Sequence, residues 1–166
     1  MVLILHGVTD ATCTRRVGTV LHEKGVQFVL KPVKWLEAEH KTPEYLEKQP
    51  FGLVPYIDDD GFILYESRAI CHYIATKYAH QGTPELVPTD LKANALFQQA
   101  VSIETSNFSE YVEKFVGEKV FKPQNGLVPD EERAKALLST LGAKLDVYDK
   151  ILSKQKYLAG DSKTPP

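Results

Sequence analysis

The sequence predicts an α/β domain followed by an all-helical domain. Residues 1–32 have the pattern strand–helix–strand, and residues 54–79 have the pattern of a hairpin followed by a helix. After residue 90 no strand pattern occurs, and two long stretches carry apolar residues at helical spacing. The expected order is therefore βαβ, a short helix and ββα, which would form a mixed four-stranded sheet, and then helices alone.

The expected domain boundaries follow from this order. We predict a first domain over residues 1–79 and a helical domain over residues 91–166. The segment 80–90 contains one glycine and two prolines and is the best linker candidate.

The first βαβ unit is predicted from apolar spacing. Met1–His6 is apolar almost throughout, as expected of a strand covered on both faces. Thr12–Lys24 has helical spacing, and Gly25 suits the end of a helix because glycine tolerates the left-handed conformation. Val26–Leu30 alternates and predicts a strand. The expected apolar stripe of the helix consists of Cys13, Val17, Val20 and Leu21.

The second half of the domain is marked by capping and turn residues. Thr42-Pro43 predicts the start of a short helix, with a hydroxyl cap and a proline at the first helical position. Val54–Ile57 and Phe62–Tyr65 flank an Asp/Gly-rich turn and predict a hairpin. Glu66-Ser67 then opens a helix whose apolar face consists of Ile70, Tyr73, Ile74 and Tyr78.

The helical domain contains two predicted long segments. Residues 91–121 have a helical pattern, and residues 123–129 read as a loop with Asn-Gly. Asp130–Lys154 is the clearest helix in the chain, and Asp130 is a plausible cap. Its expected apolar stripe consists of Leu137, Leu138, Leu141, Leu145, Tyr148 and Leu152.

Composition excludes several classes of function. The 166 residues are 43% hydrophobic and 25% charged with a net charge of −2, which predicts a soluble globular protein. There is no basic field for nucleic acid or anionic lipid, and no apolar run of membrane-spanning length. Two cysteines do not form a disulfide framework, so a reducing, cytoplasmic location is expected.

Three short segments carry candidate chemistry. Val54-Pro55 stands at the mouth of a strand, where a proline is either an edge device or part of a cis peptide bond. Glu66-Ser67 at a helix start is either a plain cap or a site for the carboxylate and ammonium of an amino acid. Cys13 follows the first turn and could be a nucleophile, although its position on the apolar stripe favours a buried, inert thiol.

Five sequence blocks occur in a fixed order: T-R-R-V, L-H-E-K, E-H-K, P-F-G-x-V-P and L-Y-E-S-R-A-I-x-x-Y-I-A. Together they resemble the phi-type glutathione transferases of plants and their fungal relatives. The resemblance is dense over residues 3–79 and thinner over residues 88–161. It implies a thioredoxin-like first domain that binds glutathione and a helical second domain that completes the electrophile site.

The resemblance also implies roles for individual residues. Pro55 would be the cis-proline, and Val54 would offer backbone hydrogen bonds to the cysteinyl part of glutathione. Glu66 and Ser67, with the adjoining Arg68, would hold the γ-glutamyl end. The glycine carboxylate would be approached by His40 and Lys41, which composition alone assigns to an exposed polar loop. Glutathione would be a co-substrate, no metal or other cofactor is implied, and a homodimer is expected.

Two site positions depart from the family pattern. Counting back from T-R-R-V, Ala11 stands where these proteins have the catalytic serine. Thr12 is the neighbouring hydroxyl that we expect to act on the thiol in its place. Leu53 stands where glutamine is usual and cannot donate a hydrogen bond to glutathione. Ala11 predicts weaker activity, and Leu53 predicts a lower affinity for glutathione.

The end of the chain is the third departure. Leu158–Asp161 resembles the stretch before a central helix of the second domain, and Thr164 stands at the expected cap of that helix. The helical domain is therefore expected to be incomplete, and a fragmentary sequence is the preferred explanation.

Three functions remain open on the sequence. The first is a transferase that conjugates glutathione to electrophilic small molecules, and the second is a weakly catalytic or non-catalytic carrier of hydrophobic ligands on the same fold. The third is a cysteine-based reductase, which Ala11 disfavours. Aromatic candidates for the wall of the second-substrate site are Phe108, Tyr111 and Phe115, for which ordinary helix packing is the simpler interpretation.

Overall fold

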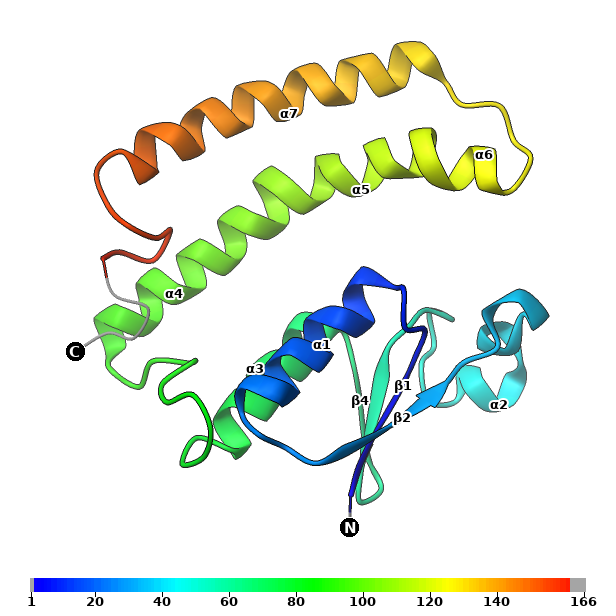
Figure 1. Cartoon of the computed structure of the whole chain (residues 1–166), viewed down its shortest axis with the longest axis vertical. Helices are drawn as coiled ribbons and strands as arrows, with labels where there is room; N and C mark the ends of the chain where they lie inside the picture. The colour runs from blue at the N-terminus through cyan, green and yellow to red at the C-terminus, as the bar shows by residue number, and fades with distance from the viewer. Residues whose placement is uncertain (1, 162–166) are drawn as a thin grey trace. The chain divides into compact units, whose positions relative to one another are not determined.

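The computed structural model describes residues 2–161, which form two compact units that divide between Val87 and Pro88. Each unit is described by itself (Figure 1). The expected helix cap at Thr164 lies outside the described residues.

The first unit contains a mixed four-stranded sheet in the order β2-β1-β3-β4. The parallel pair is β1 (Leu3–Gly7) with β2 (Phe28–Pro32). β3 (Tyr56–Asp59) is antiparallel both to β1 and to β4 (Phe62–Tyr65). The predicted βαβ-α-ββα order is confirmed, although the third strand begins two residues later than the apolar run suggested.

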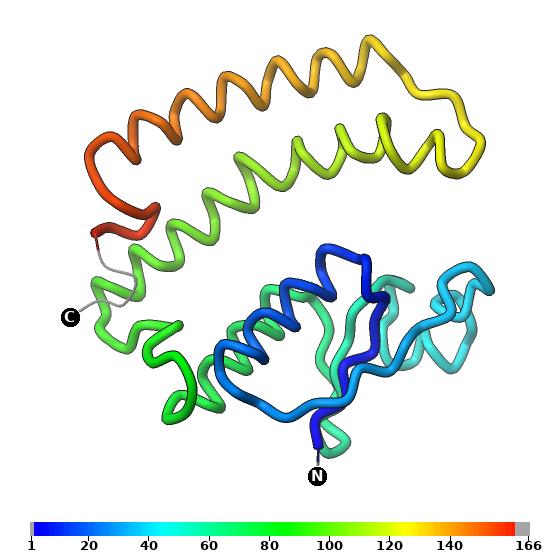
Figure 2. The backbone as a smooth tube through the Cα atoms, viewed as in Figure 1, coloured from blue at the N-terminus to red at the C-terminus, as the bar shows by residue number. Residues whose placement is uncertain are grey.

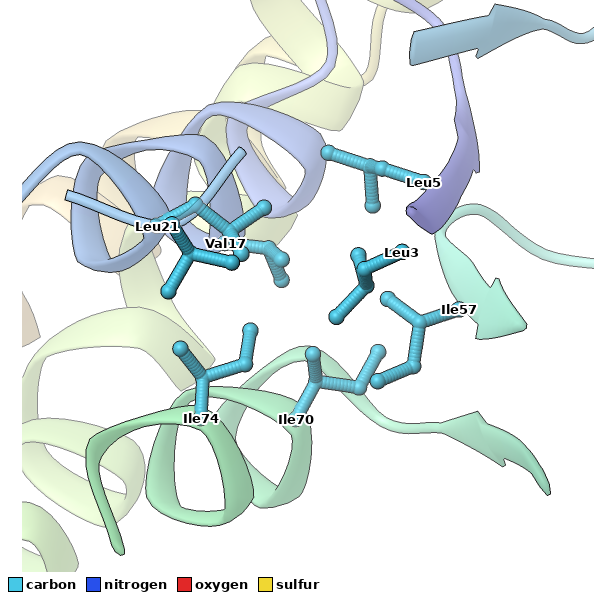
Figure 3. Close-up of a cluster of buried hydrophobic side chains, with 8 residues drawn as sticks. Leu3, Leu5, Val17, Leu21, Ile57, Ile70 and Ile74 are labelled. Atoms are coloured by element: carbon cyan, nitrogen blue, oxygen red, sulfur yellow. The ribbon is translucent and has the colours of Figure 1, made fainter. Parts of the chain in front are cut away.

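Two helices cover one face of this sheet (Figures 1 and 3). α1 (Thr12–Glu23) and α3 (Ser67–Lys77) pack against each other. Side chains alternate across a strand, so the leucines of β1 that face the helices are two residues apart. The buried residues of this core are Leu3, Leu5, Val17, Leu21, Val26, Ile57, Ile70 and Ile74.

The opposite face carries a smaller aromatic cluster. Tyr56 follows the alternation of β3 and points away from the neighbouring Ile57. Its ring packs edge-on against Tyr45 at 5.2 Å, and Val33 completes the buried set. Tyr45 comes from α2 (Pro43–Leu46), which begins as predicted because Thr42 Oγ1 accepts the Tyr45 N–H at 3.3 Å. The short helix thereby brings a phenol beneath the entry to β3.

The interpretation of Cys13 as a core residue is wrong. Thr14, at 3% exposure, occupies that position on α1, and Cys13 is only half-buried. Val17 and Leu21 lie in the core as predicted. Gly25 has φ +60°, in agreement with its expected role after the end of α1.

A buried carboxylate ties the end of β3 to α3. Asp59 accepts hydrogen bonds from Tyr73 Oη, at 2.7 Å, and from Lys77 Nζ. Burial alone would raise the pKa of Asp59, but these hydrogen bonds outweigh it and hold the pKa below the ordinary 3.8. The carboxylate therefore stabilises the folded state in its ionised form.

We expect D59N to lower the free energy of unfolding at pH 7, because it removes the ionised acceptor of these hydrogen bonds. The expected decrease is only about 1 kcal/mol, because water screens the partner lysine. A group whose pKa is lowered in the folded state stabilises that state at pH values above its unfolded-state pKa. This contribution to stability is lost as the pH falls through the folded-state pKa. Urea unfolding from pH 6 to pH 2 should therefore show a smaller decrease in stability for D59N than for the parent. Parallel curves would contradict this assignment.

The second unit is built from two long helical segments that run antiparallel (Figure 2). The first is continuous from Leu91 to Gln124 and includes two π-helical segments. The predicted start of the loop at Pro123 is therefore wrong, because the helix continues for two more residues, to Gln124. In order, its parts are α4 (Leu91–Glu104), η3 (Thr105–Ser109), α5 (Glu110–Val116), η4 (Gly117–Phe121) and α6 (Lys122–Gln124).

The returning helix, α7 (Glu131–Leu152), begins at the predicted cap. Asp130 Oδ1 accepts the Arg133 N–H at 2.9 Å, and the buried Glu118 carboxylate accepts the Asp130 N–H at 2.9 Å. The pKa of Glu118 is lowered, first by a hydrogen bond from Lys122 and second by the hydrogen bond from Asp130. The turn into α7 is therefore fixed by two carboxylates.

The leucine stripe of α7 is buried only in part. Leu141 is 8% exposed, whereas Leu138, Leu145 and Leu152 are 51%, 41% and 44% exposed. Within the described residues, no helix is long and apolar enough to cross a membrane.

The aromatic residues of α5 and η3 meet α7. Phe108 lies 6.4 Å from Tyr148 between ring centroids, and Lys144 Nζ lies 5.9 Å from the ring of Tyr111. These contacts support the simpler interpretation, helix packing, for Phe108 and Tyr111.

Candidate functional site

The Val54–Pro55 peptide bond is cis, as the resemblance implied. Pro55 is buried and Val54 is half-buried just before β3. Within residues 2–161, neither the N–H nor the carbonyl of Val54 has a hydrogen-bond partner. Unpaired main-chain groups beside a sheet are able to bind an extended peptide.

Four hydrogen bonds hold the segment just before Val54. Gln49 accepts the N–H groups of Phe51, at 2.7 Å, and Gly52, at 2.9 Å. Lys41 Nζ donates to the Gly52 carbonyl at 2.9 Å, and Tyr45 Oη donates to the Leu53 carbonyl at 2.7 Å. Val54 is thus the first residue of the connection whose N–H and carbonyl are both without a partner among the described residues.

Gly52 is required by this arrangement. Its φ is +59°, and a Cβ there would lie 2.8 Å from the His40 carbonyl oxygen. Leu53 follows Gly52 and is 49% exposed.

The start of α3 has an unusual backbone. Glu66 has φ +70° and ψ 105°, a conformation rare for a residue with a side chain, and such outliers concentrate at functional sites. Its carboxylate is exposed, and no side chain caps the helix. The first N–H groups of α3 therefore remain available to an anion.

Ser67 is buried at 6% exposure and receives a hydrogen bond from an arginine of the other helix. Arg16 Nη1 lies 2.7 Å from Ser67 Oγ and 3.4 Å from Cys13 Sγ. The Ser67 oxygen accepts from Arg16, so its own proton is free to be donated elsewhere. Arg68 follows in α3 and is half-buried.

Arg16 was missed by the sequence analysis as a site residue. It belongs to the T-R-R-V block, but its partner lies 51 positions away along the chain. Its spacing of one turn from Cys13 could have suggested a shared helix face, though not the contact with Ser67.

The start of α1 has no side-chain cap either. Ala11 is the cap residue and has no side-chain acceptor, so the first N–H groups of α1 lack the usual partner. Thr12 is the first residue of the helix, and its exposed hydroxyl bonds to no described residue. Ala11 and Thr12 lie together at this helix start, as the sequence indicated.

The E-H-K segment is not the exposed polar loop expected from composition. It forms the short 3-10 helix η2 (Glu39–Lys41), after η1 (Trp35–Glu37). His40 is 7% exposed and stacks on Trp35 with ring centroids 3.7 Å apart. Burial first, and the adjacent Lys41 second, lower the pKa of His40, so its ring is neutral at pH 7. Lys41 itself is exposed.

The Cys71 thiol is not activated by its surroundings as the reductase hypothesis requires. Burial raises the pKa of the Cys71 thiol to about 11, against the opposing charges of Arg16 and Arg68. Within residues 2–161, no cluster of three His, Cys, Asp or Glu side chains is arranged to hold a metal ion.

Comparison with known proteins decides the family. A relative from Arabidopsis thaliana, glutathione S-transferase PM239X14, is 45% identical over 96% of this chain and 74% of its own length. The chain belongs to the glutathione S-transferase family. The family model for the glutathione S-transferase N-terminal domain matches residues 12–77.

Solved glutathione transferases have the same fold. Glutathione transferase F7 from Populus trichocarpa superposes with a TM-score of 0.92 at 38% identity, over 98% of this chain and 76% of that one. Glutathione S-transferase I from maize, solved with an atrazine glutathione conjugate, superposes with a TM-score of 0.88 at 32% identity, over 99% and 76%. The phi-type resemblance and the thioredoxin-like first domain are thereby confirmed.

Proposed function

We propose that this glutathione S-transferase binds glutathione along Val54 and the uncapped helix starts, and conjugates it slowly because Ala11 replaces the catalytic serine. The unpaired main-chain groups of Val54 carry the proposal. The cysteinyl residue of glutathione would donate its N–H to the Val54 carbonyl and accept the Val54 N–H, extending the sheet by one short pairing.

The γ-glutamyl end would bind at the start of α3. Its α-carboxylate would accept the free N–H groups and the Ser67 hydroxyl, supported by the positive charge of Arg16. Its ammonium would pair with the exposed carboxylate of Glu66. Arg68 is the next residue of the motif and adds positive charge to this end of the site.

The glycine end would meet Lys41 and not His40. The Lys41 ammonium donates one proton to the Gly52 carbonyl and keeps two others for a carboxylate. His40 is neutral and stacked beneath Trp35, so we assign it a supporting role in shaping this loop.

The thiol would lie at the start of α1. The helix dipole and the uncapped N–H groups favour a thiolate there, and Thr12 carries a hydroxyl at the first position of this helix. A serine hydroxyl at position 11 would add a hydrogen bond to a charged group worth about 1.5–3 kcal/mol. Its absence predicts a thiol that ionises less readily than in a serine enzyme.

An ultraviolet difference spectrum of glutathione with the protein, recorded from pH 5 to pH 10, tests this function. We expect a thiolate band with its midpoint below the free thiol's value of about 8.5. Bound glutathione that stays protonated at pH 7 would exclude the transferase role, and turnover with a model electrophile would then be absent. No binding of glutathione would exclude the transferase role.

A ligand carrier is the second candidate. Leu53 and Phe51 place two exposed apolar side chains, at 49% and 65%, beside the proposed glutathione site. An apolar surface there favours hydrophobic compounds over hydrogen-bonded ones. Displacement of a hydrophobic fluorescent dye without turnover would support this role.

From family membership we also propose that the second substrate is a hydrophobic electrophile, and that the protein forms a homodimer and is cytoplasmic.

A further inference from the structure

We infer that Tyr45 is a positioning residue for glutathione, because its hydroxyl fixes the direction in which the Val54 N–H points. This inference rests on the proposed function, since it concerns how the same site binds its peptide ligand. Tyr45 is not among the residues that the sequence or the resemblance assigned to the site.

The geometry of one peptide unit carries the inference. Tyr45 Oη donates to the Leu53 carbonyl at 2.7 Å, and that carbonyl shares a planar trans peptide unit with the Val54 N–H. In a planar trans unit the C=O and N–H bonds point in opposite directions. A hydroxyl that holds the Leu53 oxygen on the Tyr45 side therefore turns the Val54 N–H away from the Tyr45 cluster.

The donor itself is rigidly placed. Tyr45 is 5% exposed, and its ring packs against Tyr56 and Val33 beneath the entry to β3. Burial first, with Tyr56 and Glu39 adding to it, raises the pKa of the Tyr45 phenol, so the group remains a donor throughout the working pH range. The Leu53 carbonyl has no other hydrogen-bond donor among the described residues.

This bond also explains how the site tolerates Leu53. Leu53 has no side-chain amide that could form a hydrogen bond. Its backbone is instead held by the hydrogen bond from the Tyr45 phenol to its carbonyl. Lys41 holds the preceding Gly52 carbonyl in the same way. The two consecutive carbonyls that precede the Val54 N–H are thus both fixed by side-chain donors.

The test compares Y45F with Y56F in the full chain. Each substitution removes one hydroxyl from the same aromatic cluster and keeps the ring, but the Tyr56 hydroxyl bonds to no described residue. We expect Y45F to weaken binding of glutathione and of S-methylglutathione about 3- to 10-fold in calorimetry, as the loss of one orienting hydrogen bond predicts. Y56F should stay within about twofold of the parent.

Two further readouts separate positioning from general damage. Y45F should leave the pH midpoint of the bound thiolate unchanged, because Tyr45 acts on the cysteinyl backbone and not on the thiol. In the free protein, 15N relaxation should show increased mobility of the Val54 amide in Y45F and not in Y56F.

Each outcome decides the inference. Equal losses in both variants, or parental affinity in Y45F, would overturn it. A parent protein that binds no glutathione would overturn the proposed function, and the Val54 relaxation would still decide whether Tyr45 fixes that amide. Were Y45F to unfold, Y45F in the presence of a stabilising osmolyte would be measured by the same relaxation experiment.

Discussion

A11S should increase the thiolate fraction of bound glutathione about 10- to 100-fold below pH 7, which is the effect of one hydrogen bond to a charged group. Ala11 is the N-cap residue of α1, and its side chain accepts no hydrogen bond. A serine there would bring a hydroxyl next to the free N–H groups of the helix. The midpoint of the thiolate band should fall by about one to two pH units.

Turnover in A11S should rise by less than the thiolate fraction. Nucleophilicity falls as the thiol pKa falls, with a Brønsted slope of about 0.4–0.5, so we expect kcat/KM to increase about 3- to 10-fold at pH 6.5. Above about pH 9 both proteins carry mainly thiolate, and the gain should disappear. A gain that is constant with pH would contradict thiolate stabilisation as its cause.

The control for A11S is T12A, made both alone and together with A11S. If Thr12 now acts on the thiol, T12A alone should raise the thiolate midpoint, and T12A should have little effect once Ser occupies position 11. Such non-additivity is expected of two groups that act on one atom. Additive effects would remove Thr12 from the catalytic role that we propose for it.

The fold was predictable because its signals are local. Two helix starts are marked by Thr42 and Asp130 and one helix end by Gly25, and each of the three performs the predicted function in the structure. Apolar alternation and the helical repeat then determine which faces are buried, and Ile70 and Ile74 lie in the core accordingly.

The predictions that failed depend on contacts between distant parts of the chain. His40 is polar and was expected at the surface, but Trp35 covers its ring. Cys13 and Thr14 are adjacent on α1, and which of them is buried depends on the rotation of the helix against β1, which an apolar count does not resolve. Spacing alone therefore assigned the wrong residue.

The candidate site divides in the same way. Val54, Pro55 and Glu66 are marked by motifs in the chain, whereas the groups that orient them are not. Arg16 reaches Ser67 from another helix, and Tyr45 reaches the Leu53 carbonyl from another element. Sequence reasoning finds residues that contact a ligand through conspicuous chemistry, and supporting residues resemble ordinary core or surface positions.

S67A should weaken glutathione binding about 10- to 100-fold, because it removes a hydrogen bond to the γ-glutamyl carboxylate worth about 1.5–3 kcal/mol. Ser67 is buried at 6% exposure, and its hydroxyl accepts from Arg16 at 2.7 Å, so the substitution also leaves the guanidinium without that acceptor. Calorimetry would measure the loss, and the thiolate midpoint of the glutathione that does bind should not move.

T12A provides the crossed control for S67A. Both residues carry a hydroxyl at the first position of a helix, on α1 for Thr12 and on α3 for Ser67. T12A should raise the thiolate midpoint and leave affinity nearly unchanged, whereas S67A should lower affinity and leave the midpoint unchanged. A variant that shifts both quantities equally would show that the two helix starts do not bind separate ends of glutathione, and the proposed orientation of the tripeptide would then be wrong.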